Sequence, residues 1–264
     1  MPSTETSALL ANHALPNQLQ MGGGAGYETL SAHPNLFVKQ TRRGWFQELL
    51  GCEAKTEFKI ATMQEKKGDV MYALEESSLF LRLLCPMSHS WSMTVWQGDG
   101  PEGPAVAKYQ RPLRTPLAPL KCCCHQEVQH QDANGVAIGE TVEEFFCFVP
   151  KFKITNAQGN VEYMLSQPTC WNGMFVDCWA EGVCNMRVPF YVYPEGSKHV
   201  TGQQVGKIVK VWAGLGTEMF TDADKFELVF PEGANPESKA RLLGSLFLLN
   251  QLLFEDESKE SKDE

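Results

Sequence analysis

Three adjacent cysteines, Cys122, Cys123 and Cys124, form the densest group of reactive side chains in the sequence. Neighbouring residues in an extended chain point to opposite sides, so the three thiols cannot all enter one core and at least one is expected at the surface. The cluster follows residues 112–119, a proline-containing stretch typical of an extended loop. Thiols in such a loop suit reversible S-acylation, and two or more acyl chains hold a protein stably on a membrane.

Two alternatives to lipid attachment remain open for this cluster. The thiols can be loop cysteines without a role, or they can bind zinc together with His125. Zinc sites usually contain cysteine pairs separated by two to four residues, and the run from Cys122 to His125 lacks that spacing. We therefore expect lipid attachment in preference to metal binding.

An acidic pair, Asp222 and Asp224, is the second candidate site. The two carboxylates stand at positions 1 and 3 of a calcium-loop pattern, but positions 6 and 12 hold glutamate and glycine, where an EF-hand needs glycine and glutamate. The alternation in residues 226–230 indicates a strand instead. The pair predicts either a low-affinity calcium site at a strand end, with Glu227 or Glu232 as a further ligand, or an ordinary acidic turn.

The remaining reactive residues form no recognised catalytic motif. Cys170, Cys178 and Cys184 are separated by seven and five residues, a poor match to zinc-binding spacings, so structural cysteines are expected there. The sequence contains no G-x-S-x-G, no phosphate-binding glycine loop and no H-E-x-x-H. We expect a protein that is not an enzyme.

Composition and charge limit the classes of protein to consider. The chain has 264 residues, 43% of them hydrophobic, which is enough for a sizeable packed core. A net charge of −9 gives no reason to expect nucleic-acid binding through overall charge. Nine cysteines, with no secretory signal in residues 1–20, indicate a reducing compartment in which most thiols are free.

The chain divides into three expected segments. Residues 1–30 contain few large apolar side chains and a run of three glycines, and are expected to be a disordered leader. Residues 31–255 are expected to form one folded domain. Residues 256–264 are expected to be a disordered acidic tail, since residues 255–264 hold six acids against two lysines.

Short strands dominate the expected domain from residue 57 onward, separated by turn signals such as residues 98–101. The expected strands are Glu57–Thr62, Val70–Leu74, Trp91–Trp96, Ala105–Tyr109, Gln126–Gln131, Phe145–Val149, Phe152–Asn156, Val161–Leu165, Asn185–Tyr193, Gln204–Val211 and Lys225–Phe230. Residues 36–52 are expected to be mixed, with a surface helix near residues 45–50. About a dozen strands without helix alternation predict a mostly β, antiparallel sheet or closed barrel.

One long apolar segment, Leu242–Phe254, organises the predicted fold. Only Gly244, Ser245, Asn250 and Gln251 interrupt its hydrophobic surface, so the helix it forms is apolar on all sides. About 20 apolar residues are needed to cross a bilayer, and this segment is shorter, so a buried core helix is favoured and a membrane span is the alternative. A barrel of about twelve strands leaves a lumen, which this helix is expected to fill. Its expected core side chains are Leu242, Leu243, Leu246, Phe247, Leu249 and Leu253.

Several strings, in order along the chain, resemble the phospholipid scramblase family. The residues from Val205 to Phe230 read VGKIVKVWAGLGTEMFTDADKFELVF and are followed by the apolar helix. The upstream matches are Tyr72–Ser77, Arg111–Arg114, Cys122–Cys124 and Pro150–Ile154. The resemblance covers about Leu36 to Glu255, and residues 171–182 depart from the family pattern as an insertion.

This resemblance implies a fold and an activity. The fold would be tubby-like: a closed, twelve-stranded antiparallel barrel around a central hydrophobic C-terminal helix. The activity would be calcium-stimulated, ATP-independent, bidirectional movement of phospholipids between membrane leaflets. The alternative is a lipid-anchored signalling or transcriptional adaptor of the same fold without transport. A third reading is a lipid-headgroup module that uses Lys207, Lys210, Arg111 and Arg114.

The resemblance also implies roles for particular residues. Cys122–Cys124 would be palmitoylated and would place the protein on the cytoplasmic face of the plasma membrane. Asp222 and Asp224 would bind the calcium cofactor. Lys207 and Lys210 would belong to a candidate nuclear-import segment, used when the protein is not acylated, although an ordinary strand is the favoured reading of these residues. Membrane phospholipids would be the partners, together with protein partners and oligomerisation.

Overall fold

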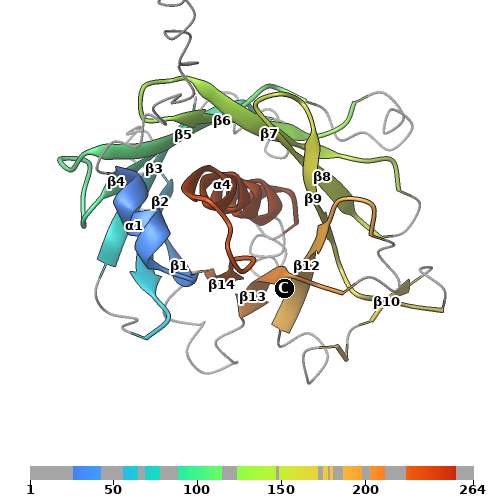
Figure 1. Ribbon diagram of the computed structural model, residues 1–264. Coiled ribbons are helices and arrows are strands. Elements are labelled where there is room, and N and C mark those ends of the chain that lie inside the picture. The colour runs from blue at the N-terminus through green and yellow to red at the C-terminus, as the bar shows by residue number, and fades with distance from the viewer. Residues whose placement is uncertain are drawn as a thin grey trace, which may run out of the picture.

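A closed, antiparallel barrel of twelve strands surrounds a single long helix in the computed structural model of this chain (Figure 1). The strands pair in chain order, and pairing of the last with the first closes the ring. The structure describes residues 26–42, 56–64, 69–77, 89–114, 124–146, 149–171, 175–177, 179–180, 187–197, 203–211 and 224–253.

The barrel and its two helices account for most of the described residues. The barrel strands are β1 (Asn35–Arg42), β2 (Thr56–Thr62), β3 (Asp69–Ser77), β4 (Trp91–Gln97), β5 (Ala105–Arg111), β6 (Glu127–Asp132), β7 (Ala137–Glu143), β8 (Lys151–Asn156), β9 (Val161–Ser166), β12 (Arg187–Pro194), β13 (Gly206–Val211) and β14 (Lys225–Val229). A separate hairpin consists of β10 (Thr169–Cys170) and β11 (Phe175–Val176). The helices among the described residues are α1 (Gly26–Ala32) and α4 (Pro236–Leu253).

Alternation along the strands builds the core. In β4, Trp91, Met93 and Val95 are buried and the residues between them are partly exposed, because successive side chains of a strand point to opposite faces. The same pattern places Phe226 and Leu228 of β14 inside the barrel. One face of each strand therefore faces the helix, while the other forms the outer surface.

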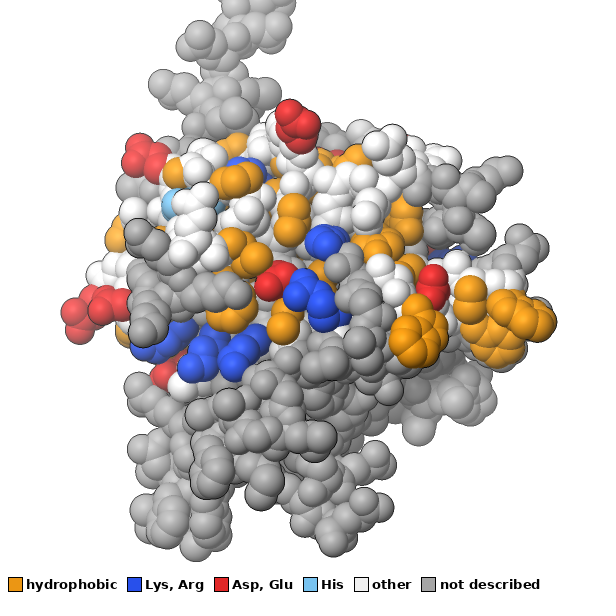
Figure 2. Space-filling view, turned by 90° about the horizontal axis from the view of Figure 1, so that it is seen from below, with side chains coloured by type: hydrophobic (Ala, Val, Ile, Leu, Met, Phe, Trp, Pro, Cys, Tyr) orange, Lys and Arg blue, Asp and Glu red, His pale blue; other side chains and the backbone are white. Residues whose placement is uncertain are grey.

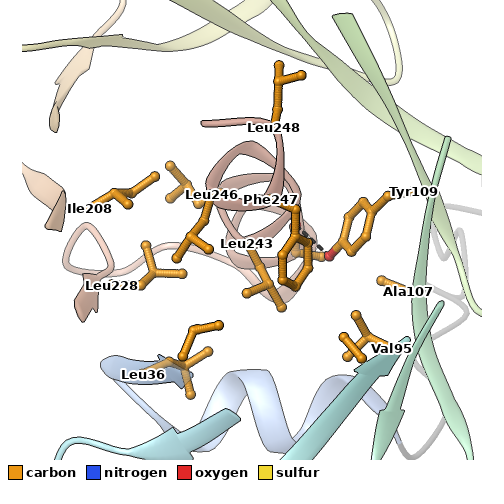
Figure 3. Close-up of a cluster of buried hydrophobic side chains, with 14 of the residues drawn as sticks. Leu36, Val95, Ala107, Tyr109, Ile208, Leu228, Leu243, Leu246, Phe247 and Leu248 are labelled. Carbon is orange, nitrogen blue, oxygen red and sulfur yellow. Dashed lines mark hydrogen bonds between the residues drawn. The ribbon is translucent and has the colours of Figure 1, made fainter. Parts of the chain in front are cut away.

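Helix α4 occupies the barrel interior. Asn235 caps its start, since the Asn235 side chain accepts a hydrogen bond of 2.8 Å from the backbone N–H of Ser238, and Pro236 suits the first helical position. Side chains on all sides of the helix are buried and contact different strands; Figure 3 shows Phe247 near Tyr109 and Leu246 toward Ile208. The predicted core residues Leu242, Leu243, Leu246, Phe247 and Leu249 are at most 1% exposed, and Leu253 is partly buried.

Glycine is required at position 244, where α4 lies close against the barrel wall. A Cβ atom at Gly244 would lie 2.4 Å from His130 Nδ1 and 2.5 Å from Tyr109 Cε1, closer than real Cβ contacts. The Tyr109 hydroxyl donates a hydrogen bond of 2.8 Å to the carbonyl of Ala240 in the same region. The interruption at Gly244 in the apolar helix is therefore explained by contact with β5 and β6.

Both ends of the helix are attached to the barrel by polar contacts. Near its start, the Lys239 ammonium donates to the carbonyls of Leu30 and His33, each at 2.8 Å, which joins α1 to α4. Near its end, the Gln251 side chain bonds the indole N–H of Trp91, and Asn250 donates to the Gln40 side chain. These contacts fix the direction in which α4 runs through the barrel.

The predicted fold class is confirmed: the protein is mostly β, with a closed twelve-stranded barrel around the apolar C-terminal helix. Among the described residues, no helix is both long enough and apolar enough to span a membrane.

Two local expectations differ from the structure. The predicted strand Phe145–Val149 is wrong, because residues 144–146 and 149 are not in a strand and Phe145 is 64% exposed. The strand in this region is β7, which escaped prediction because its inward residues Thr141 and Glu143 are polar. Strand β1 occupies part of the region expected to be mixed, and the helix expected near residues 45–50 lies outside the described residues.

The boundary of the leader also differs. The expected leader extended to Leu30, whereas α1 begins at Gly26 and Leu30 is fully buried. A seven-residue helix is too short to be stable alone, so its contacts with α4 hold it.

Candidate functional site

One end of the barrel collects the connections that carry the predicted sites. Because neighbouring strands are antiparallel, β1, β3, β5, β7, β9 and β13 all finish at the end where β2, β4, β6, β8, β12 and β14 start. We call this the loop end. Helix α4 also finishes there, since Gln251 contacts Trp91, the first residue of β4.

The loop end contains the attachment points of both predicted sites. The connection with Cys122 and Cys123 runs from β5 to β6, and the connection with Asp222 runs from β13 to β14. These three residues lie outside the described residues, but the strands on either side of them are described. The topology therefore brings Cys124 and Asp224, the described members of the two predicted sites, to the same end of the barrel.

Cys124 is the described member of the cysteine cluster. It is half-buried, is in no disulfide, and lies three residues before β6. Nearby, the Arg114 guanidinium pairs with Glu127 at 2.8 Å. The hydrogen bond to Glu127 raises the pKa of Arg114, and the charge of Cys124 as a thiolate adds to that rise. Cys124 thus lies close to a permanent positive charge.

Asp224 is the described member of the acidic pair. Its Oδ1 atom lies 3.1 Å from the ammonium of Lys210, whose side chain is 3% exposed. Its Oδ2 atom is buried and has no hydrogen-bond partner. One oxygen of the Asp224 carboxylate is therefore paired and the other is open. The Oδ2 atom could coordinate a bound cation, but the ammonium of Lys210 already neutralises much of the carboxylate charge.

The other acidic residues considered with the pair do not join Asp224. Glu227 pairs with Arg187 of β12. Glu232 follows the far end of β14, at the opposite end of the barrel from Asp224. Within the described ranges, no cluster of three histidine, cysteine or acidic side chains could hold a metal ion.

The basic residues that were considered for headgroup binding and for nuclear import lie apart from one another in the structure. Lys210 is buried against Asp224, and of the two lysines in β13 only Lys207 is partly exposed, as expected for an ordinary strand. Arg111 is 2% exposed and donates to the His89 carbonyl and to Gln126. Strand β5, which carries Arg111, is separated from β13 by five other strands. These residues therefore do not form a shared patch.

Cys170 is the described member of the second cysteine group. It lies in β10, opposite Phe175 of β11, and is half-buried, so it is less enclosed than the expected structural cysteine. Cys178 and Cys184 lie outside the described residues.

A buried polar network between the helix and the wall was missed by sequence reasoning. Ser245 of α4 and Thr141 of β7 share a hydrogen bond of 2.7 Å, and Thr141 shares another of 2.8 Å with His130 Nε2. Burial, and to a lesser extent Arg241, lowers the pKa of His130 to about 3. The interruptions at Gly244 and Ser245 in the apolar segment were the available signal for this network.

Comparison with known proteins assigns the chain to a family. The model of the Scramblase family matches residues 13–256. Similar curated proteins include phospholipid scramblase 2 of Bos taurus and phospholipid scramblase 1 of Homo sapiens, each 29% identical over 230 residues and 87% of this chain. These matches cover 71% and 66% of the two relatives, respectively. Phospholipid scramblase family member 5 of Homo sapiens is 29% identical over 208 residues, 78% of this chain and 69% of that relative.

No solved structure gives a significant match. The family match covers most of the chain, including the barrel strands and α4. This protein belongs to the Scramblase family.

Proposed function

We propose that this protein is a membrane-associated phospholipid scramblase, which moves phospholipids in both directions between leaflets without ATP. The observation that carries the proposal is the family match over residues 13–256, supported by relatives that are named phospholipid scramblases. The proposed role is transport and involves no covalent chemistry. The proposed substrates are membrane phospholipids.

Calcium is proposed as the stimulus, through Asp222 and Asp224 at the loop end. The open Oδ2 atom of Asp224 supports a ligand at this position, and the contact with Lys210 explains why the affinity would be low. Calcium can activate only if it binds one conformation more tightly than the other. Release of Lys210 from Asp224 is the conformational difference that this arrangement offers.

Reconstitution tests transport and its calcium dependence together. Purified protein in liposomes with a labelled phospholipid is expected to accelerate leaflet exchange when calcium is raised to the millimolar range. The double variant Asp222→Asn, Asp224→Asn is expected to lose the calcium response. The matched control is Glu232→Gln, which removes an acidic side chain at the opposite end of the barrel. This variant is expected to retain the calcium response. Equal calcium responses in the double variant and the wild type would contradict the assignment of these carboxylates.

Attachment to the membrane is proposed to occur through palmitoylation of Cys122, Cys123 and Cys124, at the cytoplasmic face of the plasma membrane. The position of the β5–β6 connection at the loop end supports it. Hydroxylamine-sensitive acyl exchange is expected to label these cysteines in cells, and substituting all three with serine is expected to shift the protein from membranes toward the cytoplasm and nucleus. Cys170→Ser is the control. An unlabelled cluster would remove this anchor.

A non-transporting, lipid-anchored adaptor is the second candidate function, and burial of α4 favours it. The central residues of the helix are at most 1% exposed, so a lipid path along α4 would require its release from the barrel or an assembly of several chains. In the liposome experiment, an adaptor would show no leaflet exchange at any calcium concentration. The same measurement therefore separates the two functions.

A further inference from the structure

Exposed hydrophobic side chains are concentrated at the loop end. Among the described residues, seven large hydrophobic side chains are exposed, and five of them belong to connections that start and finish at the loop end. These five are Leu113, Phe145, Trp171, Phe175 and Trp179. The other two, Val136 and Val205, lie at the opposite end of the barrel. Clustered exposed apolar residues mark interaction surfaces more often than single ones do.

Three of the five belong to the segment around the β10–β11 hairpin. Trp171 is 81% exposed, Trp179 is 68% exposed and Phe175 is 52% exposed. The rings of Trp171 and Phe175 meet edge to face with centroids 6.5 Å apart, and Asp177 N–H donates to the Pro168 carbonyl at the base of the hairpin. Figure 1 shows β10 outside the barrel ring, away from α4. We call Trp171, Phe175 and Trp179 the aromatic cluster.

The barrel wall also carries a row of basic residues. Lys225 of β14 lies directly opposite Lys39 of β1, and Lys39 lies directly opposite Lys59 of β2. Like charges opposite one another on neighbouring strands destabilise a sheet, so this row favours an anionic surface nearby. We call Lys39, Lys59 and Lys225 the lysine row.

Both features lie toward one side of the molecule. Figure 2 views the side of the barrel that contains β1, β14 and β13, and it shows basic side chains grouped on this face and hydrophobic side chains grouped at its edge. Lys225 is the first residue of β14 and therefore lies at the loop end. An apolar cluster and a basic row that face the same side of a molecule are the combination that binds an anionic lipid surface.

We infer that the aromatic cluster inserts into the interface of an anionic phospholipid membrane, with the lysine row against its headgroups. This inference rests on the proposed function for the presence of a membrane, and it adds how the barrel is oriented on it. Indole rings favour the membrane interface because their apolar body and N–H can both be satisfied there. The insertion would hold the loop end toward the lipid without requiring α4 to leave the barrel.

Vesicle binding by protein without acyl groups tests the inference. Vesicles of phosphatidylcholine, with and without phosphatidylserine, would be sedimented with the wild type and with the triple variant Trp171→Asn, Phe175→Ser, Trp179→Ser. The wild type is expected to bind the phosphatidylserine vesicles, and the triple variant is expected to lose at least about tenfold in affinity. Val136→Ser with Val205→Ser, at the opposite end, is the matched control and is expected to bind like the wild type.

Separate variants test the contribution of the lysine row to vesicle binding. Lys39→Gln and Lys225→Gln are each expected to reduce affinity about fivefold for vesicles that contain phosphatidylserine, and to leave binding to phosphatidylcholine alone unchanged. Lys108→Gln and Lys153→Gln, on β5 and β8, are the controls. Tryptophan quenching by brominated lipid in the wild-type protein gives a measurement that needs no variant.

The outcomes separate this inference from the others. Wild-type vesicle affinity in the triple variant, or no quenching by brominated lipid in vesicles that bind the protein, would overturn insertion and assign the aromatic cluster to a protein partner. Since binding is measured without lipid exchange, an absence of transport would contradict the proposed function and leave this result standing. A loss of vesicle binding in the control at the opposite end would also overturn the proposed orientation.

Discussion

Replacing Arg241 with methionine is expected to destabilise the protein by about 2–3 kcal/mol, because the contacts of a buried guanidinium are lost and the partly exposed Glu162 carboxylate loses its cationic partner. The Arg241 side chain is 3% exposed and reaches Glu162 through Nε at 3.0 Å and Nη2 at 2.5 Å. Its Nη1 also donates to the Ile138 carbonyl at 2.8 Å. Methionine would keep most of the packing volume and remove every one of these contacts.

Urea denaturation measures this loss, with two comparisons. In the double variant Arg241→Met, Glu162→Gln, part of the stability is expected to return, since the carboxylate that lost its partner is neutralised. Arg187→Met is the matched control: Arg187 also pairs with a glutamate, Glu227, but its side chain is 31% exposed. A smaller loss is expected there, since the Arg187 guanidinium is already partly in contact with water. Equal losses at positions 241 and 187 would contradict the role of burial.

Stability is expected to fall with acidification through His130. Burial lowers the pKa of this imidazole to about 3, whereas an unfolded histidine titrates near 6.5. Above pH ~6.5 the side chain is neutral in both states and contributes no pH dependence. Between pH ~6.5 and ~3 the unfolded chain takes up a proton that the folded chain does not, so stability decreases by about 1.4 kcal/mol per pH unit.

Substituting His130 with glutamine tests this titration. The free energy of unfolding, measured by urea denaturation from pH 7.5 to pH 4, is expected to decline less steeply in His130→Gln by the equivalent of one proton. Thr141→Val is the control, since it removes the hydroxyl that shares a 2.8 Å hydrogen bond with the imidazole and leaves the titrating group in place. That variant is expected to shift the curve without changing its slope. Parallel curves for His130→Gln and the wild type would exclude His130 as the source.

The architecture was predictable because its signals are local and repeated. Short strands with alternating burial, such as β4 and β14, can be recognised in the sequence because apolar and polar side chains alternate along them. The apolar segment from Leu242 was too short for a bilayer and too hydrophobic for a surface, which left the barrel interior as its place. The closed barrel then followed from the number of strands and the size of the helix.

The contacts that fix the helix were not predictable in the same way. The contact between Arg241 and Glu162 joins residues 79 positions apart, and neither side chain has a pattern that marks it as buried. Strand β7 was missed for the same reason, because Thr141 faces inward to meet Ser245 and not an apolar side chain. Whether a polar side chain can be buried in a core depends on its hydrogen-bonding partners. Those partners come from distant segments, so one segment of sequence does not reveal them.

The candidate site stays a prediction, although the structure relates two of its residues. Cys124 and Asp224 were chosen from residue type and spacing, and antiparallel topology places their connections at one end of the barrel. The pairing of Asp224 with Lys210 was not foreseen, although both residues were named separately. Their proximity depends on the register between β13 and β14, which sets Lys210 opposite Phe226 and beside the start of β14.

Pairing of β1 with β14 has a consequence for how the chain reaches its native state. Lys39 and Lys225 are neighbours in space but are separated by most of the chain, so ring closure must wait until nearly the whole polypeptide has left the ribosome. Helix α4 is translated later still, and until it arrives the inward faces of all twelve strands lack their central partner. Nascent chains that stall or terminate before residue 236 would expose those faces and become substrates for chaperones or proteases.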